Sequence, residues 1–120
     1  MSFTGSDFLT FAQNLVLGSP TEAELRNAIS RAYYAAFLRA REYCWHKGDI
    51  VDQTGRAHEQ VRRNLQRRGQ RHLAADLLNL HLLRKNADYD ITFPKPDLSA
   101  EANAAEQLAA MVIAAIDALP

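Results

Sequence analysis

Residues 21–44, TEAELRNAISRAYYAAFLRAREYC, form the longest helical pattern in the chain. Thr21 followed three positions later by Glu24 is typical of a capping box at the start of a helix. Apolar residues then recur every three or four positions and fall on one helical face. They are Leu25, Ala28, Ile29, Ala32, Tyr33, Ala36, Phe37, Ala40 and Cys44. The stretch therefore predicts a long helix that buries one continuous face and ends near Gly48.

Shorter helical patterns lie on both sides of this one. Their starts are indicated by residues that favour N-caps, and their ends by glycine or proline. A polar connector at residues 49–55 separates the long helix from those that follow. The expected helices run from Ser6 to Gly18, from Thr21 to Gly48, from Ala57 to Gly69, from Arg71 to a fading end at residues 86–90, and from Ser99 onward.

Two prolines interrupt the pattern before the last helix. Pro94 and Pro96 lack a backbone donor and restrain the residues before them, so residues 91–97 are predicted to form a loop. Helices joined by short connectors tend to pack antiparallel. The predicted fold is therefore all-α, an antiparallel up-and-down bundle of four main helices plus a shorter N-terminal helix. A chain of 120 residues favours one domain, residues 1–120.

Composition says more about where the protein resides in the cell than about what it binds. The 14 Lys and Arg balance the 14 Asp and Glu, so net charge indicates no partner class. Cys44 is the single cysteine, and its apolar neighbours favour a core thiol over a nucleophile. No segment approaches the ~20 apolar residues that cross a membrane, and no signal-peptide pattern is present. We expect a cytoplasmic protein that binds no membrane, and the scattered histidines predict neither a metal site nor a cofactor.

Residues 83–90, LRKNADYD, place charged and tyrosine side chains where a leucine stripe ends. Arg84 continues that stripe, so its guanidinium is expected to be partly buried and to need an acceptor. Asp88 lies one turn later and can be that acceptor in a structural pair. Alternatively Arg84 faces a cleft, where Tyr89 adds a hydroxyl donor and a stacking face and Asn86 lies on the same turn.

Arg31, Tyr33 and Tyr34 lie in the middle of the long helix. Tyr33 belongs to the apolar face, whereas Tyr34 is rotated by about 100° and is expected at a groove or a partner chain. Arg31 lies near the edge of the same face. A structural role and a role in binding a phosphate or nucleotide both stay open here, with Arg31 and Tyr34 as the binding candidates.

Two of these motifs together resemble a known family. Arg31-Ala-Tyr-Tyr-Ala-Ala-Phe37 and Arg84-Lys-Asn-Ala-Asp-Tyr-Asp90, with His58 and Val61 between them, resemble the HEPN domain family, the higher-eukaryote and prokaryote nucleotide-binding domain. The resemblance is to its ADYD-type prokaryotic stand-alone members. It implies a helical bundle, a homodimer that binds RNA or a nucleotide, and a partner of the minimal nucleotidyltransferase family in a toxin–antitoxin or defence pair.

The resemblance also implies a possible reaction. HEPN ribonucleases carry an arginine followed after four to six residues by a histidine, which moves the proton of the ribose 2′-hydroxyl while arginine stabilises the scissile phosphate without a metal. Counting from Arg84, Tyr89 occupies the histidine position. Its ordinary pKa of about 10 makes it a poor base near neutral pH. His81, three residues before Arg84, is the alternative base, so the candidate catalytic residues are Arg84, Tyr89 and His81.

Arginines gather in the segment from residue 56 to residue 71. Arg56, Arg63 and Arg67 can share one helical face, which suits an RNA backbone or an acidic partner protein. An ordinary solvated face explains the same pattern. A second class of function therefore stays open, a non-catalytic helical interaction module in which Arg84 and Asp88 form a structural pair.

Overall fold

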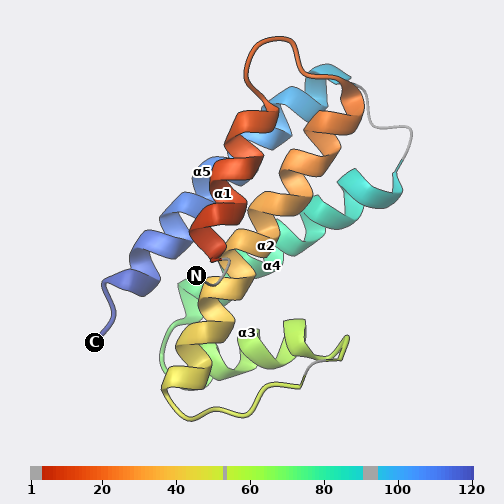
Figure 1. Ribbon diagram of the computed structural model, residues 1–120. Coiled ribbons are helices and arrows are strands. Elements are labelled where there is room, and N and C mark those ends of the chain that lie inside the picture. The colour runs from red at the N-terminus through yellow and green to blue at the C-terminus, as the bar shows by residue number, and fades with distance from the viewer. Residues whose placement is uncertain (1–3, 53, 91–94) are drawn as a thin grey trace.

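The protein is all-helical, as predicted. The computed structural model describes residues 4–52, 54–90 and 95–120, and no strand occurs among them. The helices are α1 (Gly5–Leu15), α2 (Glu22–His46), α3 (Ala57–Arg67), α4 (Arg71–Tyr89) and α5 (Lys95–Asp117). α2 is the longest and contacts each of the others. Figure 1 shows it running through most of the molecule, with α3 beside its C-terminal end.

The apolar face predicted for α2 lies at the centre of the core. Every residue of that face, from Leu25 to Cys44, is buried. The predicted capping box is also present, because the Glu24 N–H donates to the Thr21 hydroxyl at 3.2 Å and the Thr21 N–H donates to the Glu24 carboxylate at 2.9 Å. Burial, followed by the charge of Asp49, raises the pKa of the Cys44 thiol to about 11. The prediction of a core thiol is confirmed.

The predicted start of α1 is wrong by a short distance. α1 begins at Gly5, and its N-cap is Thr4 rather than Ser6. The Thr4 hydroxyl accepts the Asp7 N–H at 3.2 Å, and the Asp7 carboxylate accepts the Thr4 N–H at 2.8 Å. Thr4 is the better cap because an acidic residue follows it by three positions, whereas Leu9 occupies that position after Ser6.

The predicted start of α5 is also wrong. The helix begins at Lys95, so residues 95–97 are helical rather than part of a loop, and Ser99 lies inside the helix instead of capping it. The remainder of that predicted loop, residues 91–94, lies outside the described residues. Pro96 falls in the first turn, where backbone N–H groups have no acceptor within the helix, so its missing donor costs no hydrogen bond.

Candidate functional site

Arg84 lies near the C-terminal end of α4 and is largely buried. Its side chain is 14% exposed, and Nε donates to Asp88 Oδ2 at 3.2 Å. The guanidinium carbon lies 5.2 Å from the Tyr34 ring centroid and 5.8 Å from the Tyr33 ring centroid. The structural pair that the sequence suggested is therefore present, and the same guanidinium also faces the adjacent tyrosines of α2.

Two histidines meet close to Arg84. The ring centroids of His58, in the first turn of α3, and His81, on α4, are 5.2 Å apart. The Tyr33 ring lies 5.2 Å from His81 and 5.6 Å from His58, and the Tyr33 hydroxyl is hydrogen-bonded to His58 Nδ1. Arg62 follows His58 by one turn of α3 and acts electrostatically on both imidazoles. We call Tyr33, His58, Arg62, His81 and Arg84 the histidine cluster.

Burial and neighbouring cations hold both imidazoles neutral. Desolvation, followed by repulsion from His58, Arg62 and Arg84, lowers the pKa of His81 to about 4. Desolvation also lowers the pKa of His58, followed by repulsion from Arg84, Arg62 and Arg41, and no carboxylate offsets either shift. Near neutral pH both imidazoles are therefore unprotonated, in a positive field that opposes their protonation.

Nitrogen atoms around the cluster are buried without hydrogen-bond partners. In the part of the chain that the structure describes, Arg41 Nε, Arg62 Nη1 and His81 Nδ1 have no hydrogen-bond partner. In the same residues, neither Arg41 nor Arg62 forms an ion pair. Leaving a buried donor unpaired costs about 1–3 kcal/mol. The arrangement favours a ligand that supplies acceptors, such as phosphate oxygens.

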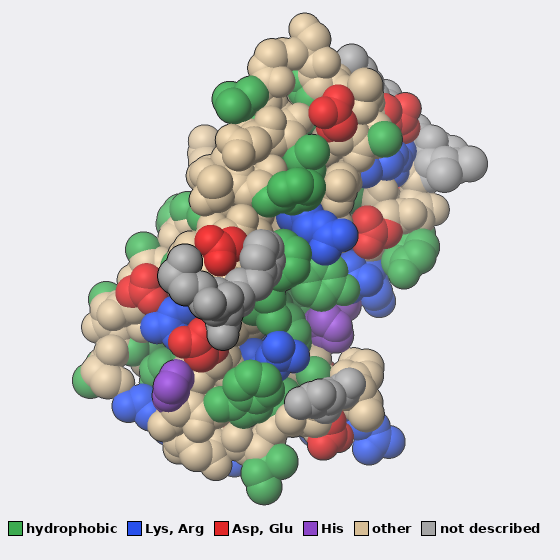
Figure 2. Space-filling view, viewed as in Figure 1, with side chains coloured by type: hydrophobic (Ala, Val, Ile, Leu, Met, Phe, Trp, Pro, Cys, Tyr) green, Lys and Arg blue, Asp and Glu red, His purple; other side chains and the backbone are tan. Residues whose placement is uncertain are grey.

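The surface view agrees with this mixture of chemistry. Figure 2 shows Lys and Arg side chains beside a histidine and hydrophobic side chains near the middle of one face. A flat ligand that carries negative charge needs such a mixture, because its rings require apolar contacts and its phosphate requires cations.

Arg31 contacts Asn27 and Phe8, and no hydrogen bond or ring contact joins it to Arg84 among the described residues. Its Nε donates to Asn27 Oδ1 at 3.2 Å, and its guanidinium carbon lies 5.5 Å from the Phe8 ring centroid. The Phe8 ring lies 6.4 Å from that of Tyr34. Among the described residues the structure thus brings Tyr34 to Arg84, whereas Arg31 lies beside a separate hollow of about 310 Å³ that Phe8 also lines.

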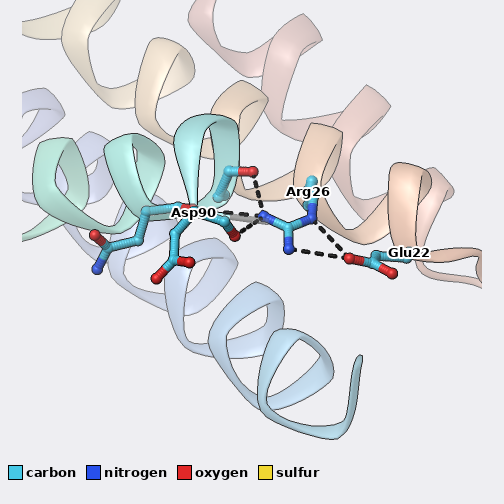
Figure 3. Close-up of polar contacts among 5 residues, drawn as sticks. Glu22, Arg26 and Asp90 are labelled. Atoms are coloured by element: carbon cyan, nitrogen blue, oxygen red, sulfur yellow. Dashed lines mark hydrogen bonds and ion pairs between the residues drawn. The ribbon is translucent and has the colours of Figure 1, made fainter. Parts of the chain in front are cut away.

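A long-range contact holds the end of α4 in place (Figure 3). Arg26 Nη1 donates to the carbonyl oxygens of Ala87 at 2.8 Å and of Asp90 at 2.7 Å, while Arg26 Nη2 donates to Glu22 Oε1 at 3.0 Å. The last carbonyls of a helix lack partners within it, so this guanidinium caps α4 from outside. It therefore fixes the segment that carries Arg84, and sequence analysis did not find it.

The other candidates at this end of α4 are more exposed. Tyr89 is 73% exposed, and no hydrogen bond or ring contact joins its side chain to Arg84 or a histidine among the described residues. Asn86 is exposed, and its carbonyl oxygen accepts the Asp90 N–H at 2.9 Å. Of the two proposed bases, only His81 belongs to the histidine cluster.

The arginines of α3 that were predicted to share a face are exposed. We call Arg56, Arg63 and Arg67 the basic surface. Arg63 pairs with Glu59 at 2.8 Å, and Arg67 donates to the Asn64 side chain. Arg63 and Arg67 line one hollow of about 460 Å³, and Arg56 lies at the start of α3 outside that lining. Glu59 thus compensates part of the positive charge of the basic surface. In the histidine cluster, only Arg84 has an acidic partner among the described residues.

The sequence did not identify Arg41 or Arg62 as site residues, and it indicated His58 only through the resemblance to the HEPN family. The spacing of His58 and Arg62, four residues apart, indicates that they share a face of α3. That spacing does not say which face meets α4, and only the packed structure places them beside His81.

Known proteins give no further guidance. Comparisons of the chain with family models, curated proteins and solved structures find no match. Within the described residues, no group of three or more His, Cys, Asp or Glu side chains is placed to hold a metal ion. In the same residues, no helix combines the length and apolar character needed to cross a membrane. Function is therefore inferred from the geometry of the site.

Proposed function

We propose that this chain is a HEPN-like protein that binds RNA or a nucleotide, with the ligand phosphate at the histidine cluster. One observation carries the proposal. Buried nitrogen atoms of Arg62 and His81 lack hydrogen-bond partners beside a second histidine, and no carboxylate balances this end of the cluster. A phosphate supplies both the acceptors and the charge. Arg84 adds a further cation, and Tyr34 adds a ring beside it.

The same groups suit metal-independent cleavage of RNA. His81 accepts the proton of the ribose 2′-hydroxyl, whose oxygen attacks the adjacent phosphorus. The bond from phosphorus to the 5′-oxygen breaks, and that oxygen takes a proton from water. Arg84 stabilises the charge on the phosphate as it builds. His81 suits the role of base better than Tyr89, because its imidazole is unprotonated near pH 7 whereas a tyrosine hydroxyl keeps its proton, although a pKa of about 4 makes His81 a weak base until the anionic phosphate binds.

The biological setting in this proposal follows from the resemblance to HEPN domains. The chain is one domain, an antiparallel up-and-down bundle that forms a homodimer in the cytoplasm. Its partner is a minimal nucleotidyltransferase in a toxin–antitoxin or defence pair. The basic surface adds contacts to the RNA backbone, which makes affinity fall as salt increases.

A second candidate function is a non-catalytic helical interaction module. The ion pair between Arg84 and Asp88 at 3.2 Å favours it, since Arg84 already has an acceptor. Tyr89 at the family's histidine position favours it as well. In that case the basic surface docks an acidic protein and the histidine cluster only packs α2 against α3 and α4.

Incubation of the purified protein with total RNA and labelled short RNAs, in the presence of a chelator, separates the two. We expect the wild-type protein to cleave, Arg84→Ala to lose cleavage, and Arg39→Ala to retain it. Arg39 is the matched control because it is a half-buried arginine on α2 whose ion pair, to Asp117 at 2.7 Å, lies outside the cluster. Circular dichroism must show that both variants keep the helical fold.

Cleavage that survives in Arg84→Ala contradicts the catalytic proposal. If the wild-type protein binds RNA without cleaving it, the nucleotide-binding proposal stands and the catalytic proposal is wrong. Absence of both favours the interaction module.

A further inference from the structure

Four side chains at successive intervals of four residues form a continuous stack along α2. They are Tyr33, Phe37, Arg41 and Trp45, and we call them the α2 stack. The Tyr33 and Phe37 rings lie 5.9 Å apart at 19°. The Arg41 guanidinium carbon lies 5.6 Å from the Phe37 centroid and 4.5 Å from the Trp45 centroid. Twelve residues separate the two ends, so the stack extends along about 18 Å of helix.

The two ends of the α2 stack have different surroundings. Tyr33 is buried and belongs to the histidine cluster, and the next ring, Phe37, lies 4.5 Å from His58. Trp45 is 42% exposed at the other end. The stack therefore connects the proposed phosphate site with a flat aromatic surface that solvent reaches.

Charge along this path favours an anionic ligand. Arg41 Nε is buried without a hydrogen-bond partner among the described residues, and the arginine forms no ion pair there. The nearby acids are already paired. Asp49 contacts Arg68 at 2.8 Å, and Glu42 contacts Arg39 at 3.9 Å. Trp45 thus lies beside the Arg41 guanidinium, whose positive charge no acidic side chain among the described residues neutralises.

We propose that Trp45 and Arg41 form a stacking subsite for an unpaired base, so that the RNA bound at the histidine cluster is single-stranded. Every base has a flat face that stacks on an aromatic ring, and an arginine nearby adds cation–π attraction and holds the phosphate. Bases inside a duplex are stacked on one another and cannot reach this surface. The inference rests on the proposed function, because the histidine cluster supplies the phosphate end of the same ligand.

Trp45 is the single tryptophan of the chain, so its fluorescence reports on this subsite alone. We expect oligoadenylate to quench it on binding, with N-acetyltryptophanamide as the correction for absorption by the RNA. The same strand annealed to its complement is expected to bind more weakly and to quench less. Tripolyphosphate, which has charge but no base, is expected to leave the emission largely unchanged. Poly-glutamate tests an acidic protein as the occupant.

Substitutions test whether the ring contributes to affinity. Trp45→Leu keeps an apolar side chain but removes the flat face, and we expect about tenfold weaker binding of labelled oligoadenylate by fluorescence anisotropy. Trp45→Phe is expected to recover most of the loss, which a general effect on folding would not produce. Met111→Leu, an exposed apolar position on α5, is the control and is expected to bind as wild type.

The outcomes separate this inference from the proposed function. Oligoadenylate that binds without quenching, and with equal affinity to Trp45→Leu, overturns the stacking subsite while leaving phosphate binding intact. Quenching by poly-glutamate and not by oligoadenylate overturns it in favour of a protein partner. A wild-type protein that binds no RNA overturns the proposed function and the inference together.

Discussion

The histidine cluster and the basic surface both draw arginines from α3, yet their surroundings differ. Arg62 is half-buried, acts electrostatically on both imidazoles and has a buried nitrogen without a hydrogen-bond partner. Arg63, the next residue, has a side chain that is 72% exposed and pairs with Glu59 at 2.8 Å. Adjacent residues of one type therefore have opposite environments, because consecutive positions on a helix point about 100° apart.

The comparison teaches that the number of arginines says little about a binding site. An exposed pair in water contributes at most about 1 kcal/mol, since solvent already satisfies both partners. A half-buried guanidinium without a partner has lost that solvation and gains more from an incoming anion. The histidine cluster, with fewer exposed cations, is thus the stronger candidate for specific binding.

Replacing Arg62 and Arg63 in separate variants is the strongest test of the difference between the histidine cluster and the basic surface. Arg62→Ala should weaken RNA binding by about tenfold or more, since hydrogen bonds to charged groups contribute about 1.5–3 kcal/mol. Arg63→Ala should weaken it by less than about threefold. Anisotropy of a labelled short RNA at fixed ionic strength measures both. Equal losses would show that only general charge matters.

The contact that holds the end of α4 is expected to affect stability rather than RNA binding. Arg26→Met keeps the length of the side chain but removes its donors to Ala87 and Asp90, and should lower the free energy of unfolding by about 2 kcal/mol. Arg63→Met, on the basic surface, should lower it by less than about 0.5 kcal/mol. Urea denaturation measures the difference, and faster amide exchange at residues 86–90 should accompany it. Equal free energies of unfolding for Arg26→Met and Arg63→Met would show that the Arg26 contact does not stabilise the end of α4.

Stability is also expected to depend on pH. His81 has a pKa of about 4 in the folded protein, below the value of about 6.5 expected when unfolded. The unfolded chain therefore takes up a proton first, and the free energy of unfolding should fall as pH decreases from about 6.5 to about 4. His81→Gln should flatten this slope, whereas His46→Gln, at an exposed position, should leave it unchanged. Urea denaturation across this range provides the measurement.

Much of the fold follows from local sequence patterns. The buried face of α2 and the capping box at Thr21 are matters of spacing, so they were predictable. The starts of α1 and α5 were not, because rival signals lie a few residues apart. Thr4 and Ser6 are both favourable caps, and Pro96 is compatible either with a loop or with a first helical turn.

The site was only partly predictable, for a physical reason. Arg84 and Asp88 are separated by one turn, so their pair could be expected from spacing. The approach of His58 to His81 joins α3 to α4 and depends on the register of one helix along the other. Single-sequence patterns carry the rotation of a helix toward the core but not its registry along a neighbour.

The Arg26 contact also has a consequence for the order of folding. It joins residues 64 positions apart in the sequence, so its loop-closure entropy must be overcome before the contact forms. We expect α4 to form most of its turns early through local hydrogen bonds and to gain this last cap only once α2 has packed against it. During synthesis, the segment around Arg84 can reach its final position only after three-quarters of the chain has emerged, and the core is completed later still, when α5 packs against α2.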